Sequence, residues 1–227
     1  LNFKEADLKK AAAQKLRLPE AGIRKVELLR KAVDARKKTD IRFVCTLGAQ
    51  IEGNEEKLLR HLKDSNVQRA EACRYEPPKA TVPKRELPPV VIGFGPGGMF
   101  AALLLARQGL CPLVLERGQP VAERKKAVER FWKSRVLDPN SNVQFGEGGA
   151  GTFSDGKLNT GTSDPRIRWV LEELVKAGAP PEILTEAKPH VGTDRLPGVV
   201  EAVRRQILEL GGQVRFGACV TDFILKN

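Results

Sequence analysis

Apolar and polar positions in the first 75 residues follow two different periods. The segment 5–16 places its leucines on one helical face, whereas Ile41, Phe43 and Cys45 alternate with polar neighbours as in a half-buried strand. The pattern predicts, in chain order, a helix at 5–16, strands at 26–33 and 41–51, a helix at 55–62 and a strand at 67–73. This α-β-β-α-β order predicts a small α+β domain over residues 1–75, ferredoxin-like if a further strand precedes it.

A proline-rich stretch follows this first set of elements. Residues 76–89 contain five prolines in 14 positions, and proline continues neither a helix nor a central strand. We therefore expect an extended linker at 76–89 that divides the chain into a small and a larger domain.

Apolar runs alternate with helical patterns beyond this linker. Short runs predict strands at 90–92, 113–115 and 213–216, and amphipathic patterns predict helices at 100–107, 164–178 and 199–210. The longest apolar stretch is interrupted by a glycine turn and does not predict a membrane span. Strands that alternate with helices indicate a parallel sheet, so we expect a Rossmann-like α/β domain over residues 90–227.

Three glycines with G-x-G-x-x-G spacing lie between the first strand and the first helix of this larger domain. They are Gly93, Gly95 and Gly98, and Glu116 follows the next strand 18 residues after Gly98. In a dinucleotide site these glycines allow a tight turn, a close approach of the backbone to a pyrophosphate and close packing of helix on strand. An acidic residue at the position of Glu116 can accept hydrogen bonds from ribose hydroxyls.

A second glycine cluster occupies residues 146–158. Five glycines in 11 residues give a backbone that can wrap closely around a ligand and turn its N–H groups inward. Thr152 and Ser154 add hydroxyl donors, and Lys157 could neutralise a phosphate or lie near a flavin ring nitrogen. Apolar residues flank the cluster, which favours a ligand-binding loop over a flexible surface loop.

The two glycine elements and Glu116 resemble those of the two-dinucleotide-binding-domain flavoproteins, which have the glutathione-reductase-type FAD fold. Glu116-Arg117-Gly118 is similar to the acid-basic-glycine ending of that superfamily's first motif. More closely, the run 142–158 and the basic turn at 34–38 resemble a family of FAD-dependent dehydrogenase-like proteins, that is, NAD(P)/FAD-dependent oxidoreductases. The resemblance covers nearly the whole chain.

This resemblance implies an FAD-dependent oxidoreductase, with NAD(P)H as a candidate electron donor and a small-molecule substrate that the sequence does not identify. The expected cofactor-binding residues are Gly93, Gly95, Pro96, Gly97, Gly98, Met99, Glu116, Arg117, Gly148, Gly149, Ala150, Gly151, Thr152, Asp155, Gly156, Lys157, Leu158 and Val220. No residue is assigned a catalytic role. His190 is the best candidate because histidine titrates near neutrality, although a lone histidine is more often structural.

Two departures from the superfamily pattern limit what the resemblance implies. Residues 148–158 contain no cysteine, which excludes thiol–disulfide chemistry by a cysteine pair in this loop. The superfamily's late Gly-Asp motif, which holds the ribityl and phosphate groups of the flavin, is absent, and the chain resembles the N-terminal part of a longer protein. We therefore expect the chain alone to lack activity.

The positive charge of the chain is concentrated before and within the linker, which raises the question of nucleic-acid binding. Residues 1–85 hold 21 Lys and Arg against 12 Asp and Glu, whereas residues 86–227 hold 18 against 16. A basic domain can bind RNA, but its few aromatic residues disfavour base stacking, so we favour solvated basic turns. A module that binds NAD(P) without flavin and an RNA-binding or RNA-modifying flavoprotein remain the alternatives.

The four cysteines (Cys45, Cys73, Cys111 and Cys219) lie far apart and form no C-x-x-C pair. This spacing favours reduced thiols over a disulfide framework, and with two histidines in the chain we expect no metal site. We therefore expect a cytoplasmic protein that does not bind membranes. An organellar address stays open because the sequence begins at Leu1.

Overall fold

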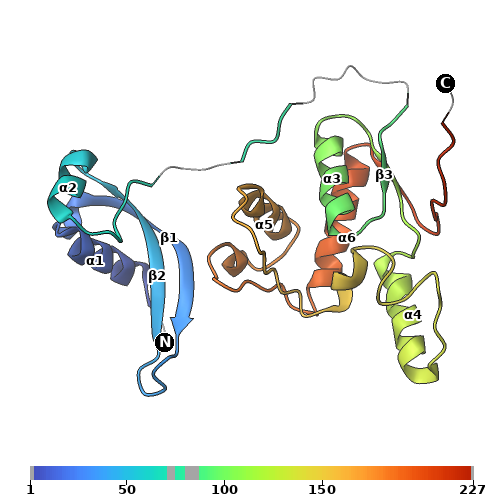
Figure 1. Cartoon of the computed structure of the whole chain (residues 1–227), viewed down its shortest axis with the longest axis horizontal. Coiled ribbons are helices and arrows are strands. Elements are labelled where there is room, and N and C mark those ends of the chain that lie inside the picture. Colours follow the sequence, from blue (N-terminus) through green and yellow to red (C-terminus); the bar gives the residue numbers. More distant parts are fainter. Residues whose placement is uncertain (1–2, 71–74, 80–86, 226–227) are drawn as a thin grey trace. The chain divides into compact units, whose positions relative to one another are not determined.

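The structure is a computed structural model that describes residues 3–70, 75–79 and 87–225. The chain forms two compact units (Figure 1). The first unit comprises Leu1–Arg74 and Pro181–Pro189, and the second comprises Tyr75–Pro180 and His190–Asn227. Each unit contains both helices and one small sheet, so the predicted mixture of α and β structure is confirmed.

The first unit is a long β-hairpin with helices on one side. Its elements are α1 (Glu5–Leu16), the 3₁₀ turn η1 (Glu20–Gly22), β1 (Ile23–Asp34), β2 (Arg42–Ile51) and α2 (Glu55–Leu62). Strands β1 and β2 pair antiparallel. Ala12, Ala13 and Ile23 form the buried core, against which Leu16 and Val26 pack. Both predicted helices are confirmed with the predicted bounds, and both strands form, with β1 extending further than the pattern indicated.

The predicted strand at 67–73 is wrong over residues 67–70, which the structure describes without a strand; residues 71–73 lie outside the described residues. Asp64 turns the chain here, because its carboxylate accepts hydrogen bonds from Asn66 and its carbonyl accepts one from the Val67 N–H. The outer edge of β1 is bridged by a different segment. The Lys31 N–H donates to the Thr185 carbonyl at 2.7 Å, and Ala187 donates to the Lys31 carbonyl at 2.9 Å.

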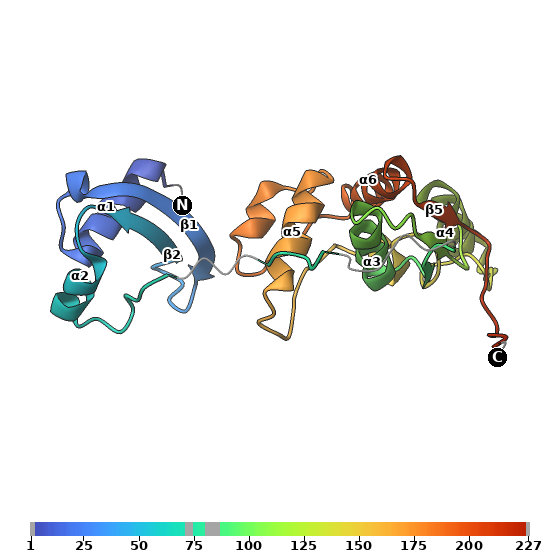
Figure 2. The same ribbon diagram turned by 90° about the horizontal axis from the view of Figure 1, so that it is seen from above.

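The second unit contains a three-stranded parallel sheet with the order β3-β4-β5. Its elements are β3 (Val90–Ile92), α3 (Pro96–Arg107), β4 (Leu113–Leu115), α4 (Val121–Ser134), η2 (Gly149–Phe153), α5 (Arg166–Lys176), η3 (Pro181–Leu184, assigned to the first unit), α6 (Leu196–Glu209) and β5 (Gln213–Arg215). The three predicted strands are confirmed, and the helices form within a few residues of their predicted bounds. Figures 1 and 2 show α3 and α6 side by side.

The core of the second unit lies between the sheet and these two helices. Leu103 on α3, Val114 on β4, and Val203 and Ile207 on α6 are fully buried. Gly98 brings α3 directly against the turn after β3, since an added Cβ would lie 2.0 Å from the Gly93 carbonyl oxygen. This packing fixes the first turn of α3 at the end of the sheet.

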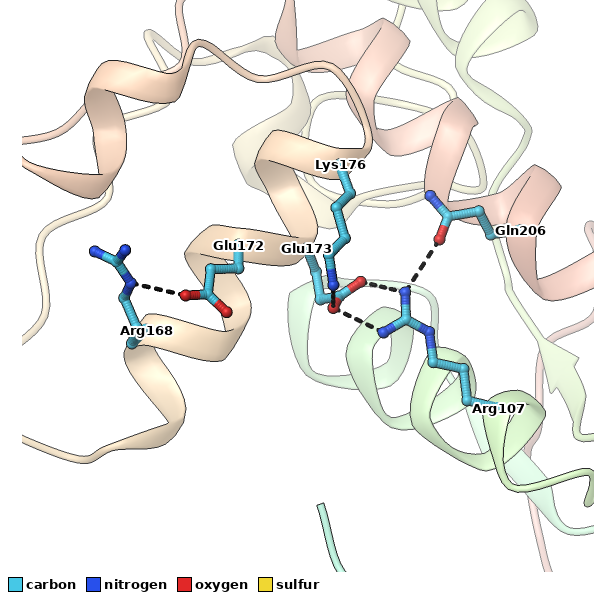
Figure 3. Close-up of polar contacts among 6 residues, drawn as sticks. All are labelled: Arg107, Arg168, Glu172, Glu173, Lys176 and Gln206. Atoms are coloured by element: carbon cyan, nitrogen blue, oxygen red, sulfur yellow. Dashed lines mark hydrogen bonds and ion pairs between the residues drawn. The ribbon is translucent and has the colours of Figure 1, made fainter. Parts of the chain in front are cut away.

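A group of charged side chains joins α5 to α3 and α6 (Figure 3). The carboxylate of Glu173 is fully buried and accepts hydrogen bonds from both Nη1 and Nη2 of Arg107. The distance from Nη1 to Oε1 is 2.7 Å. Lys176 Nζ lies 2.9 Å from Glu173 Oε1, and Gln206 Oε1 lies 3.5 Å from Arg107 Nη2. Burial opposes the ionisation of Glu173, but the hydrogen bonds from Arg107 and Lys176 outweigh it and hold its pKa below the usual value.

Cys45, Cys111 and Cys219 are free thiols, and Cys73 lies outside the described residues. In the described part of the chain, none of the helices has both the length and the apolar content that crossing a membrane requires.

Candidate functional site

The first glycine turn connects β3 to α3 at the carboxyl end of the parallel strands. Gly93 adopts a φ of 87° and donates its N–H to the Leu115 carbonyl at 2.8 Å. Gly95 is the N-cap of α3 and Pro96 follows at the first helical position, where its fixed φ suits the helix and its missing N–H costs nothing. The N–H groups of Gly97 and Gly98 follow in the first turn and have no acceptor within the helix, so this end of α3 favours an anion.

Glu116 joins three segments at this turn. Its side chain is buried, with 5% of the residue exposed. Oε2 accepts from the Phe94 N–H at 2.6 Å, and Oε1 accepts from Gly118 at 2.8 Å and Gly146 at 3.0 Å. A carboxylate has about four acceptor positions, so three backbone donors leave about one for a ligand hydroxyl. Sequence reasoning missed this structural role of Glu116.

The second glycine cluster lies directly against the first. The Gly148 N–H donates to the Phe94 carbonyl at 2.8 Å. Gly149 has a φ of 68°, and a Cβ added there would lie 3.2 Å from the Gly95 Cα and 3.4 Å from the Pro96 Cδ. Only a residue without a side chain allows this approach in that conformation. The structure therefore brings together the two loops that the sequence separates by some fifty residues.

Beneath the second loop lies a fully buried arginine, Arg124 of α4. Its guanidinium donates to the carbonyl oxygens of Asn142, Val143 and Glu147, the last at 2.6 Å, and lies over the Phe153 ring at 4.9 Å. Burial lowers its pKa to about 10, so it remains charged at neutral pH. Charge-assisted bonds to three carbonyl groups fix the path of the chain into the glycine loop. The surface-like charge pattern of α4 gave no signal of this role.

Glu147 carries the matching buried negative charge. Its Oε2 accepts from the Val121 N–H at 2.8 Å and its Oε1 lies 3.0 Å from Arg204 Nε. Burial raises its pKa, against the effect of the Val121 hydrogen bond and of Arg204. The only sequence signal for Glu147 is that it is the one acidic residue among the glycines at 146–151.

Besides Glu116, two further predicted site residues turn their side chains into the protein. Met99 is buried at 3% exposure, and Thr152 at 1%. The Thr152 hydroxyl, expected to meet a ligand, instead donates to the Glu147 carbonyl at 2.8 Å. The exposed members of the predicted set at this point are Pro96, Gly97, Ala150 and Gly151, with Gly95 and Gly149 partly exposed.

Arg117 and Val220 were predicted near the adenosine end. The Arg117 guanidinium lies over the Phe145 ring at 4.4 Å and donates to the Pro139 carbonyl, while its Nε is buried without a hydrogen-bond partner among the described residues. After β5, the Ala218 N–H donates to the Glu116 carbonyl at 2.9 Å. The chain leading to Val220 therefore runs beside the Glu116 segment.

The remaining predicted residues, at 155–158, pair with a segment that sequence reasoning did not connect to them. Lys157 and His190 form an antiparallel bridge. Val191 donates to the Gly156 carbonyl at 3.0 Å, and Gly192 donates to the Asp155 carbonyl at 3.3 Å. The Lys157 ammonium, expected to face a ligand, pairs with Asp155 at 2.8 Å. This pairing holds the pKa of Asp155 below and that of Lys157 above the usual value.

Comparison with known proteins identified two similarities. Residues 1–50 match the model of a domain of unknown function, DUF8436. The chain is also 46% identical over 220 residues to an uncharacterised protein of Clostridium beijerinckii. That alignment covers 97% of this chain and 41% of the relative, so the chain spans less than half of the relative's length.

Proposed function

We propose that this chain forms the nucleotide-binding part of an FAD-dependent oxidoreductase related to the FAD-dependent dehydrogenase-like proteins. In this proposal the second unit is a partial Rossmann-like FAD domain and the first unit a small ferredoxin-like domain. The observation that carries it is the direct contact of the two glycine loops, which are joined through the Glu116 carboxylate and the Gly148–Phe94 hydrogen bond.

The geometry of the second unit fits a dinucleotide. In open α/β sheets ligands bind beyond the carboxyl ends of the strands, which is where Gly95 and the first turn of α3 lie. Apart from Gly95 and its two chain neighbours, the one heavy atom of the described residues within 4 Å of a Cβ placed on Gly95 is the Gly149 Cα, at 3.9 Å. The backbone at Gly95 is thus open to a pyrophosphate on its free side, and the helix N-terminus supplies donors and a favourable dipole.

In this arrangement each part of the dinucleotide meets its own group of residues. Gly93–Gly98 would hold the pyrophosphate, whereas Met99 has a buried side chain and an N–H that donates to the Gly95 carbonyl at 2.9 Å, so it would only support the first turn of α3. Glu116, Arg117 and Val220 would contact the adenosine, and the loop from Gly148 to Leu158 would approach the flavin half. When bound, FAD supplies the capacity to accept and release two electrons, and the protein supplies placement and electrostatics. NAD(P)H is the electron donor we propose, and the substrate is a small organic molecule.

Two neighbouring glycines provide a matched test. Gly95→Ala adds a methyl group that makes only an ordinary contact in the free protein, but it occupies the space a pyrophosphate needs. Gly97→Ala adds the same group where nothing lies within 4 Å apart from its chain neighbours and the nearby backbone of α3, and where the dinucleotide motif tolerates any residue. We expect Gly95→Ala to weaken FAD binding by at least about tenfold, or about 1.4 kcal/mol, and Gly97→Ala to leave it within about twofold.

The measurement is FAD affinity by fluorescence titration, with unfolding midpoints to show that both variants remain folded. Titration with NAD+ and NADP+ in place of FAD examines the alternative of a nicotinamide dinucleotide. Equal FAD affinities of the two variants would contradict the proposed cradle. Absence of FAD binding by the unaltered chain would contradict the proposed function.

A further inference from the structure

The bridge between residues 155–157 and 190–192 forms a short two-stranded ribbon at the end of the second glycine loop. Here "the ribbon" means these six residues, all in the second unit. Its two faces have different surroundings. Gly156 and Val191 are buried, and a Cβ on Gly156 would lie 3.3 Å from both the Val191 Cβ and the Leu196 Cδ2. One face of the ribbon is therefore fixed to the core.

The other face carries three titratable side chains. Residues directly opposite in an antiparallel pair project to the same side, as do residues two apart in one strand. Lys157 lies opposite His190, and Asp155 lies two residues before Lys157. The 2.8 Å ion pair between Asp155 and Lys157 agrees with this arrangement, and all three residues are exposed.

We infer that this face is the acid–base part of the proposed dinucleotide site, with His190 as the group that exchanges a proton with the reacting molecule. The inference rests on the proposed function. The loop that carries Asp155 and Lys157 begins at the glycines beside Gly95, so the ribbon directly follows, along the chain, the loop assigned to the flavin half. His190 is the one histidine of the second unit, because the chain has two and His61 lies on α2.

The step is the transfer of one proton between a ring nitrogen of His190 and an oxygen or nitrogen of the reacting molecule. The donor's N–H or O–H bond breaks, its electron pair stays on the donor atom, and the new bond forms on the acceptor atom. Histidine suits this step because both its protonation states are accessible near neutral pH. The ligand class is a small polar molecule with an ionisable O–H or N–H group.

The test follows the two imidazoles by NMR in the chain labelled with ¹⁵N-histidine. Spectra are recorded at one pH for the free chain, for the chain with FAD and for the FAD-loaded chain reduced with dithionite. His61 is the internal control, since its Nδ1 lies 2.7 Å from the Lys57 carbonyl in the first unit. A His61→Gln variant assigns the signals. FAD retention by the unaltered chain and by His61→Gln is measured in parallel from flavin absorbance.

We expect FAD to shift the His190 signals, and reduction to change the protonated fraction of His190, while His61 remains unchanged. Retention of FAD by His61→Gln should stay within twofold, because His61 lies on α2 in the first unit. Retained FAD with unmoved His190 signals would overturn this inference and leave the proposed function standing, as would signals that shift on binding but not on reduction. Failure of the unaltered chain to retain FAD would overturn both.

Discussion

Glu116 holds its three loops with one carboxylate, and this makes it the single side chain on which the site geometry most depends. Its three acceptor contacts run to the glycine turn, to its own strand end and to the second glycine cluster. Hydrogen bonds to a charged group contribute more than those to a neutral one. A substitution at Glu116 therefore acts on stability as well as on any ribose contact.

Glu116→Gln is expected to lower the free energy of unfolding by about 1–3 kcal/mol. The amide nitrogen of glutamine cannot accept a hydrogen bond, so at least one buried backbone N–H group would lose its partner. Denaturant unfolding measures this change. The control is Glu129→Gln, an exposed acid on α4, which should change stability by less than about 0.5 kcal/mol. Equal effects of the two substitutions would show that the three backbone contacts contribute nothing beyond an ordinary surface charge.

At the scale of elements, the buried ion pair of Glu173 with Arg107 connects α5 to α3, the helix whose N-terminus carries the first glycine turn. Glu172 provides a neighbouring comparison, since it pairs with Arg168 of the same helix (Figure 3) and both side chains are partly exposed. Glu173→Gln should cost about 1–3 kcal/mol, because it weakens hydrogen bonds to a fully buried carboxylate. Glu172→Gln should cost at most about 0.5 kcal/mol, as expected for a partly exposed i,i+4 pair.

The lowered pKa of Glu173 also predicts how this difference depends on pH. A carboxyl whose pKa is lower in the folded than in the unfolded state stabilises the fold above its unfolded value, near 4.5, and loses that contribution as pH falls through the folded value. The stability difference between the unaltered chain and Glu173→Gln should be constant from about pH 6 to 8 and shrink below about pH 4.5. A difference that grows on acidification would contradict the described ion pairs.

At the scale of the whole molecule, local patterns predicted local structure well. The helix bounds of α1 and α2 followed from periodicity. Strands β3 and β4 followed from short apolar runs that begin after a proline and end at Gly93 and Glu116. Contacts between distant segments left no such trace. The expected strand at 67–73 is absent over residues 67–70, whereas residues 185–187 bridge β1, and no repeat in the sequence indicates a pairing across some 150 residues.

The residues of the candidate site also fall into those that local sequence patterns predicted and those that depend on distant contacts. The glycine spacing and Glu116 were visible because backbone conformation and close approach demand particular residues at fixed intervals. Arg124, Glu147 and the pairing of His190 with Lys157 were not visible, because each depends on a partner far along the chain. A charged residue on an amphipathic helix has the same pattern whether its head group meets water or carbonyl oxygens.

The claim that both glycine loops hold one FAD is tested most directly by amide hydrogen exchange with and without FAD. The account predicts that FAD slows exchange in both 93–99 and 146–152 together, while α2 in the first unit exchanges at an unchanged rate. Slower exchange in the first segment alone, or in neither, would contradict it.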